Sequence, residues 1–208
     1  MADEKKFSGC VLAGGKSSRM GNDKAWLEIN GKTFLENAVD SLRPFCSLVK
    51  IVLNKSQPHF IEKIPAECSY IFDVFENRGA LGGIHAALQN CETEFAVILA
   101  VDLPFVSRKA IEKLCQAALD SKDFAAIVPH QNDGRLQPLC AVYRVKDCLP
   151  KLEELLDEND SASVRDFLKL ISPKYIEANR LSANENLLFN VNHPTDFQSV
   201  SLLKNKSS

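Results

Sequence analysis

The chain has 208 residues, 45% of them hydrophobic and 25% charged, with a formal net charge of −2 at pH 7. This length allows one domain that buries roughly 70% of its unfolded surface, and the interspersed charges form no basic stripe of the kind that binds nucleic acid through many phosphates. No segment reaches the ~20 apolar residues that cross a bilayer. Residues 1–6 lack the apolar stretch of a signal peptide.

The first half of the chain alternates short apolar runs with helical patterns. Strands are predicted over residues 7–13, 49–53, 70–72 and 95–101. Helices are predicted over residues 33–42, where apolar residues recur every three or four positions before Pro44, over residues 81–89 behind a group of glycines, and from a Ser107 cap to about residue 119.

The second half continues the pattern to the end of the chain. It predicts strands over residues 124–128, 139–143 and 174–178, and helices over residues 149–158, 163–170 and 194–204. Strands that alternate with helices indicate parallel βαβ units, and runs that are apolar throughout indicate strands covered on both faces. We therefore predict a single-domain, three-layer α/β/α Rossmann-like fold over residues 1–208, with a mostly parallel sheet.

The cysteines bear on the compartment of the protein. There are seven, an odd number, scattered along the chain, and no pair has the two-residue spacing of zinc ligands. Several lie in apolar runs, where a thiol acts as a small buried side chain. We expect a reduced, cytoplasmic protein.

Four predicted strands end in glycine or polar residues. Gly14 with Gly15, Asn54, Asp73 and Asp102 each follow directly on an apolar run. Ligands of such sheets bind beyond the carboxyl ends of the strands, near the point where the strand order reverses. The sequence therefore predicts a site at this edge of the sheet.

The loop from Gly14 to Gly21 has the composition of an anion-binding loop. Glycines allow the backbone to approach a ligand closely, successive amides can form an anion-binding concavity, and Arg19 and Lys24 add positive charge. The loop is neither a Walker A motif nor a Gly-x-Gly-x-x-Gly fingerprint. The alternative, an ordinary glycine turn with solvated basic residues, is less favoured because the loop follows a strand and carries both cations.

Asp102 is a candidate magnesium ligand. Mg²⁺ takes one or two carboxylates and completes its coordination with phosphate oxygens and water, so a single aspartate opposite a phosphate loop suits a nucleoside triphosphate site. The alternative is a turn, because Leu103 and Pro104 follow.

Other polar positions have two interpretations each. The glycines of residues 79–83 precede a helix predicted from about Ile84, and either approach an anion there or allow helix packing. Asn54 and Asp73 either contact a base or ribose, or close turns. Asn190 and Asn192 point the same way if extended, or form a turn before Pro194. The four histidines show no partner pattern; His59 and His85 are interpreted as surface or helix-packing residues, and no role is assigned to His130 or His193.

With these residues in view, the chain resembles the molybdenum cofactor guanylyltransferase (MobA) family. The resemblance is strongest in the segment LAGGKSSRMGNDKAWLEINGKTFLE. It continues, in the family's order, with the segments GALGGIHAAL, AVDLPFVS, DGRLQPLCAVYR and FNVNHPTDF. The resemblance therefore covers nearly the whole chain. It implies a nucleotidyltransferase that joins GMP from GTP to the terminal phosphate of molybdopterin with Mg²⁺ as cofactor and releases pyrophosphate. Ala80, where the family usually has proline, and His193, where threonine is frequent, depart from the pattern.

The resemblance also implies roles for particular positions. The GTP-binding set is Leu12, Ala13, Gly14, Gly15, Lys24, Asn54, Asp73 and Asp102; the metal ligand is Asp102; the catalytic set is Arg19, Lys24 and Asp102; and the acceptor-binding residues are Asn190 and Asn192. The nucleotide-binding part then covers about residues 7–105 and the acceptor-binding part about residues 106–204. The acceptor phosphate is already ionised near neutral pH, so no general base is needed and catalysis consists of positioning and charge neutralisation.

Two other functions remain open from the sequence. A relative that uses CTP is disfavoured because cytidylyl enzymes typically have Ala-Ala-Gly where this chain has Ala13-Gly14-Gly15. A non-catalytic nucleotide-binding accessory protein is disfavoured because neither the loop cations nor Asp102 is missing. Beyond its substrates we expect transient contacts with molybdoenzymes or cofactor-delivery proteins, and no nucleic-acid or membrane partner.

Overall fold

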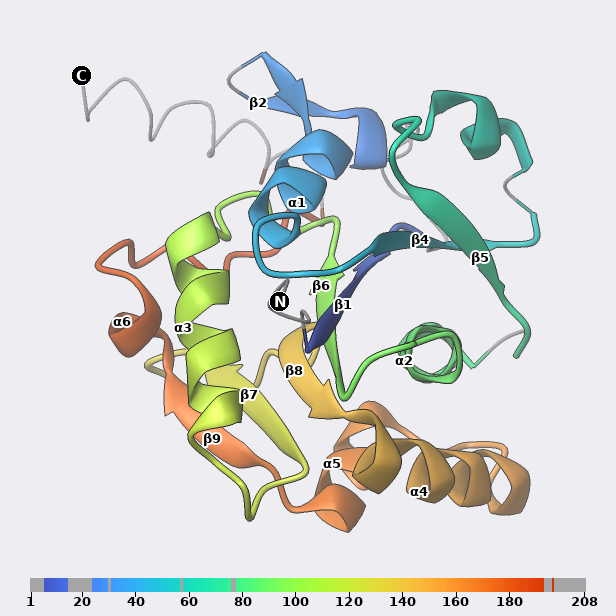
Figure 1. Cartoon of the computed structure of the whole chain (residues 1–208), viewed down its shortest axis with the longest axis vertical. Coiled ribbons are helices and arrows are strands. Elements are labelled where there is room, and N and C mark those ends of the chain that lie inside the picture. Colours follow the sequence, from blue (N-terminus) through green and yellow to red (C-terminus); the bar gives the residue numbers. More distant parts are fainter. Residues whose placement is uncertain are drawn as a thin grey trace, which may run out of the picture.

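Seven strands form one sheet in the order β5-β4-β1-β6-β8-β7-β9 (Figure 1). The computed structural model describes residues 6–14, 24–29, 31–56, 58–75, 78–192 and 196. The strands of this sheet are β1 (Phe7–Leu12), β4 (Val49–Asn54), β5 (Ser69–Asp73), β6 (Phe95–Ala100), β7 (Ala126–His130), β8 (Cys140–Arg144) and β9 (Lys174–Glu177). The strands β2 (Glu28–Ile29) and β3 (Lys32–Thr33) form a separate antiparallel pair.

The sheet is mostly parallel, as predicted. β8 alone runs against its two neighbours, β6 and β7, and all the other pairs are parallel. The predicted succession of parallel units therefore fails at β8, which runs opposite both to β7 before it and to β9 after it, and the reversal begins in the connection between β7 and β8. Residues 131–139 form turns there, and a parallel crossover needs a dozen or more residues, usually with a helix.

Helices cover both faces of the sheet (Figure 1). They are α1 (Phe34–Leu42), α2 (Ala80–Gln89), α3 (Arg108–Leu119), α4 (Val145–Glu158), α5 (Val164–Ile171) and α6 (Ala178–Leu181). One face carries α1, α3 and α6, and the other carries α2, α4 and α5. Every residue of β1 and of β6 is buried, which explains why these runs are apolar throughout. The predicted three-layer architecture is confirmed.

The predicted elements that fall within the described residues are present, with shifts at their ends. α1 begins behind a Thr33 capping box with Glu36, and Ser107 caps α3 as predicted. α4 begins at Val145, earlier than predicted, and includes Pro150. The predicted helix over residues 194–204 lies outside the described residues except for Asp196. Two short 3-10 helices, η1 (Lys24–Trp26) and η2 (Pro58–Lys63), were not predicted.

The strand order reverses between β1 and β6. The chain passes from β1 outward to β4 and β5, and then returns to place β6 on the other side of β1. The segments that follow β1 and β6 thus flank the switch point, where ligands of α/β sheets bind. None of the helices formed by the described residues has the length and apolar composition of a membrane-spanning segment.

Candidate active site at the carboxyl edge of the sheet

A cavity of about 440 Å³ opens at the carboxyl ends of β1, β4, β5 and β6, within the size range of small-molecule sites. The members of the predicted GTP-binding set that line it are Leu12, Ala13, Gly14, Lys24, Asn54, Asp73 and Asp102. The structure therefore brings together residues from four strand ends, as predicted. Gly15 and Arg19, the other predicted members of the loop, lie outside the described residues.

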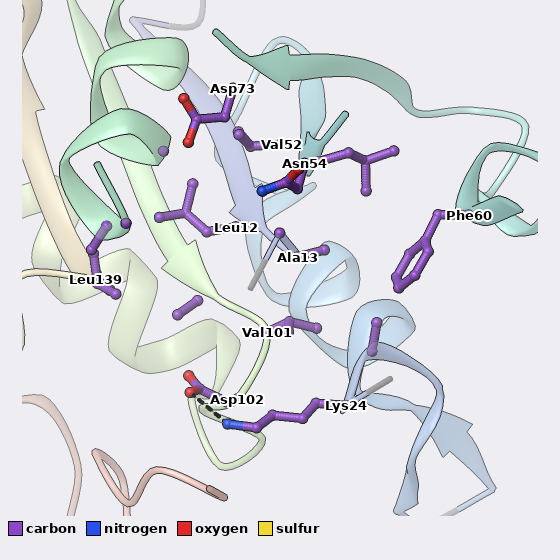
Figure 2. Close-up of a pocket in the computed structure, with 17 residues that line it drawn as sticks. Leu12, Ala13, Lys24, Val52, Asn54, Phe60, Asp73, Val101, Asp102 and Leu139 are labelled. Carbon is purple, nitrogen blue, oxygen red and sulfur yellow. Dashed lines mark hydrogen bonds and ion pairs between the residues drawn. The ribbon is translucent and has the colours of Figure 1, made fainter. Parts of the chain in front are cut away.

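The cavity has two polar ends. Figure 2 shows Asn54 and Asp73 at one end and Lys24 with Asp102 at the other, while Leu12, Ala13, Val52 and Val101 lie between them. The wall beside Asn54 carries the ring of Phe60, from η2. Sequence reasoning missed Phe60, because a six-residue 3-10 helix leaves no periodic signal.

Gly14 allows β1 and β4 to meet closely at the base of the cavity. Its N–H donates to the carbonyl oxygen of Val52 at 3.0 Å. A Cβ atom at this position would lie 2.8 Å from the backbone nitrogen of Asn54. A side chain here would push the ends of the two strands apart. Glycine is therefore required at residue 14 because the backbones of β1 and β4 approach closely.

Asn54 and Asp73 both close turns at the ends of their strands. Asn54 Oδ1 accepts from the N–H of Ser56 at 3.0 Å, and Asp73 Oδ1 accepts from the N–H of Phe75 at 2.9 Å. The turn interpretation is thus confirmed for both, and both also line the cavity. Burial raises the pKa of Asp73, and the Phe75 N–H and the nearby His85 only partly offset this effect.

The glycine segment after β5 differs from its prediction. α2 begins at Ala80, one residue before the helix predicted over residues 81–89, so Gly82 and Gly83 lie inside its first turn and do not precede a helix that starts near Ile84. Gly79 is the N-cap, with φ of 54°. A Cβ on Gly82 would lie 2.5 Å from both carboxylate oxygens of Asp73. The N-terminal end of α2, with its unpaired amides, therefore points toward the end of the cavity that holds Asp73.

Arg78 ties this segment to the far end of α4. Its guanidinium donates to the carbonyl oxygens of Leu156 and Asn159 at 2.5 and 2.7 Å, and to Asp160 Oδ1 at 2.8 Å. The side chain thus caps the C-terminus of α4. It also fixes the backbone immediately before Gly79 and Ala80, both of which line the cavity.

The other end of the cavity is a network of charged and amide groups. Lys24 Nζ lies 3.5 Å from Asp102 Oδ2 and donates to Asn192 Oδ1 at 2.7 Å. Asn190 Nδ2 donates to Asp102 Oδ1 at 3.4 Å. The N–H of Val191 donates to the backbone oxygen of Asp102 at 2.9 Å. The two predicted acceptor-side asparagines therefore lie beside Asp102 and Lys24.

The oxygen atoms around Lys24 Nζ are of the kind that bind cations. A carboxylate oxygen and an amide oxygen, from Asp102 and Asn192, already surround the positively charged Nζ. Hard divalent cations such as Mg²⁺ prefer oxygen ligands of this kind. Among the described residues, no three His, Cys, Asp or Glu side chains lie close enough to hold a metal. Phosphate oxygens or water would therefore have to complete the coordination of any metal bound to Asp102.

No described histidine contacts the cavity. His85 belongs to α2, and its side chain is buried. Its ring packs edge-on against Phe75, and Nε2 lies 3.6 Å from Glu153 Oε1. His130 lies at the end of β7, and Nδ1 is 3.0 Å from the backbone oxygen of Gln131. His193 lies outside the described residues. The helix-packing interpretation of His85 is confirmed.

Comparisons with known proteins place the chain beside a known family. The family model described as the MobA-like NTP transferase domain matches residues 9–177. A probable molybdenum cofactor guanylyltransferase from a Geobacillus strain is 32% identical over 94% of this chain and 98% of its own length. A probable molybdenum cofactor guanylyltransferase from Peptoclostridium acidaminophilum is 34% identical over 89% of this chain and 84% of its own length.

A solved structure has the same fold. Molybdopterin-guanine dinucleotide biosynthesis protein A from Archaeoglobus fulgidus superposes with a TM-score of 0.79. The superposition covers 96% of this chain and 99% of that protein, at 24% sequence identity. The shared architecture thus extends over almost the whole length of both chains.

Proposed function

The chain belongs to the molybdenum cofactor guanylyltransferase family of MobA-like NTP transferases, and from this premise we propose that it transfers GMP from GTP to the terminal phosphate of molybdopterin. Pyrophosphate is the second product. The protein is thus a nucleotidyltransferase. The observation that carries the proposal is the polarity of the cavity, with Lys24 and Asp102 at one end and Asn54 and Asp73 at the other.

We assign the Asn54 and Asp73 end to the nucleoside. Burial raises the pKa of Asp73, so a hydrogen bond donated by a ligand would stabilise its ionised carboxylate. Guanine and ribose both supply such donors. The apolar surface between the two ends gives the base a face to pack against. Gly14 and Gly15 let the backbone approach the phosphates.

We assign the Lys24 and Asp102 end to the phosphates. The positive charge of Lys24, with that of Arg19, would hold the β- and γ-phosphates and stabilise the leaving pyrophosphate. Nucleotidyltransferases generally use a divalent metal, and we propose Mg²⁺ held by Asp102. When bound, it would neutralise charge that develops on the α-phosphate and on the leaving group. The acceptor phosphate attacks in its ionised form, so the proposed reaction needs no general base.

The acceptor lies on the side of Asn190 and Asn192. Both side chains belong to the network around Asp102, so an acceptor held there would have its phosphate close to the reacting α-phosphate. Residues 7–105 then form the nucleotide-binding part and residues 106–204 the acceptor-binding part.

Seven free thiols, four of them with a pKa raised to about 12 by burial, support a reducing, cytoplasmic setting. In that setting we propose transient contacts with molybdoenzymes or cofactor-delivery proteins.

A nucleotide-specificity assay tests the function. Purified protein with molybdopterin and Mg²⁺ should release pyrophosphate from GTP, and form the guanine dinucleotide, at least tenfold faster than from CTP. Preference for CTP would identify a cytidylyltransferase. Binding of GTP without turnover would identify a nucleotide-binding accessory protein.

Replacement of Asp102 tests the site within that function. We expect Asp102→Asn to lower kcat by more than tenfold, because the amide cannot supply the charge that holds a metal. The fold should persist, since the backbone oxygen of residue 102 still accepts from Val191. Asp133→Asn, at an exposed hairpin position, is the matched control. Undiminished turnover in Asp102→Asn would contradict the metal role.

A further inference from the structure

Gln137 is a buried polar side chain to which neither the motifs nor the proposed chemistry assigns a role. It lies in the turn between β7 and β8 and is only 7% exposed. Its N–H donates to the carbonyl oxygen of Pro129 at 2.8 Å, and its own carbonyl oxygen accepts from the N–H of Cys140 at 3.1 Å. Because both backbone groups are fixed, the position from which the side chain extends is fixed as well.

The side chain begins a chain of hydrogen bonds that ends at Asp102. Gln137 Nε2 donates to Asn190 Oδ1 at 2.7 Å, and Asn190 Nδ2 donates to Asp102 Oδ1 at 3.4 Å. The chemistry of the groups fixes this order. An ionised carboxylate only accepts hydrogen bonds, so Asn190 must present its NH₂ to Asp102, which leaves its oxygen facing Gln137. Gln137 must then present its own NH₂.

We propose that Gln137 is a positioning residue that acts through Asn190 to hold Asp102. It keeps the Asn190 amide in the orientation that donates to Oδ1, and Oδ2 then faces Lys24 and the cation-binding side of the cavity. Asn190 gains a second role beside that of acceptor contact. The inference rests on the proposed function of Asp102, but it assigns to Gln137 a role that this function alone does not require.

The proposal predicts losses of different size for two substitutions that keep the size of the side chain. Gln137→Met keeps most of the volume but removes the donor, so the Asn190 amide loses the bond that selects its orientation. Gln137→Glu offers only acceptor oxygens when ionised, so Asn190 would have to turn its NH₂ toward residue 137 and its oxygen toward Asp102. An oxygen beside Oδ1 repels the carboxylate, so Gln137→Glu should be the more damaging.

Metal binding supplies a readout that does not depend on turnover. Mn²⁺ would be titrated into the full chain with GTP present and followed by electron paramagnetic resonance, and kcat and the KM for GTP would be measured with Mg²⁺. We expect Gln137→Met to weaken Mn²⁺ binding and lower kcat three- to tenfold, with the KM for GTP changed less than twofold. Gln116→Met is the control, since Gln116 is exposed on α3 and contacts Asp120 instead.

A double-mutant cycle with Asn190→Ala separates this role from general support of the fold. If Gln137 acts through Asn190, Gln137→Met should have no further effect on Mn²⁺ binding once Asn190 is alanine. Equal effects of Gln137→Met in both backgrounds, or a loss of thermal stability with unchanged Mn²⁺ binding and kcat, would overturn the proposal. The proposed function fails by different results, namely a preference for CTP over GTP or binding of GTP without turnover, and the metal role of Asp102 fails by undiminished turnover in Asp102→Asn.

Discussion

At the level of single residues, the two carboxylates of the cavity are held in different ways. Asp102 has a cation on one oxygen and an amide donor on the other. Asp73 has one backbone N–H on Oδ1, and its pKa is raised by burial. The first arrangement fixes the orientation of the carboxylate and directs Oδ2 toward a cation. The second suits a group whose charge is stabilised further when a ligand donates a hydrogen bond to it.

The position of Asp73 depends on the absence of a side chain at residue 82. We expect Gly82→Ala to displace the Asp73 carboxylate, because the added Cβ would lie 2.5 Å from both of its oxygens. The carboxylate can rotate away, and alanine favours the helix, so the free energy of unfolding should not fall. Affinity for GTP should fall on the order of tenfold, as measured by isothermal titration calorimetry.

The companion variant Asp73→Ala identifies the cause. If Gly82→Ala acts by moving Asp73, combining the two substitutions should weaken GTP binding no more than Asp73→Ala alone. Additive losses would place the effect elsewhere in the first turn of α2.

At the level of secondary structure, one arginine connects two helices, α2 and α4, that are far apart in the sequence. Arg78 precedes α2, and its guanidinium binds the last carbonyl groups of α4 together with Asp160. α2 contributes its first turn to the cavity, whereas α4 only covers the sheet. The contact therefore fixes the first turn of α2, which lines the cavity, relative to the C-terminus of α4.

We expect Arg78→Met to affect both stability and nucleotide binding. Two carbonyl oxygens would lose a charged donor, which should lower the free energy of unfolding by about 1–3 kcal/mol. The freed backbone at Gly79 should raise the KM for GTP several-fold, with a smaller change in kcat. Urea unfolding and steady-state kinetics measure the two effects. Arg135→Met is the control, because that side chain is 73% exposed and pairs with Asp133 on a surface hairpin.

An unchanged KM for GTP in Arg78→Met, with stability lost, would show that the arginine supports α4 alone. An unchanged free energy of unfolding would show that the contacts of its guanidinium contribute little.

The strands and most helices could be predicted because each leaves a local pattern. β1 and β6 are buried on both faces and show continuous apolar runs, α1 shows its apolar spacing, and α3 shows its Ser107 cap. The reversal of β8 left a weaker signal, namely too few residues after β7 for a crossover. The helix over residues 81–89 was predicted to within one residue of its start, but Gly82 and Gly83 were also placed before it because glycines normally mark the outside of a helix, whereas here they serve packing inside its first turn.

The site could be predicted only in part, for a related reason. Gly14, Asn54, Asp73 and Asp102 were found because strand ends converge by topology. The contact of Asn190 with Asp102 joins residues 88 positions apart, and Gln137 joins Asn190 across 53 positions. Pairings of this kind follow from the packing of the whole chain, and no local spacing encodes them.

At the level of the whole molecule, the cavity lies where the two hydrophobic cores meet. Ala13, Phe60 and Ala100 belong to the core on the side of α1 and α3, while Leu12 and Val52 belong to the core on the side of α2 and α4. All five residues line the cavity. A ligand bound there contacts both cores at once, so its binding free energy should stabilise the entire domain.

This arrangement predicts the response of the domain to its nucleotide. GTP with Mg²⁺ at 100 times the dissociation constant should raise the free energy of unfolding by about 2.7 kcal/mol, which for a chain of this length is a rise in Tm of about 5–10 °C. CTP at the same concentration should raise it far less. Hydrogen exchange should slow in both α1 and α2, because the ligand bridges the two cores. Slowing in α2 alone would mean that the nucleotide rests on one side of the sheet, and an equal Tm shift with CTP would contradict the assignment of the cavity to guanine.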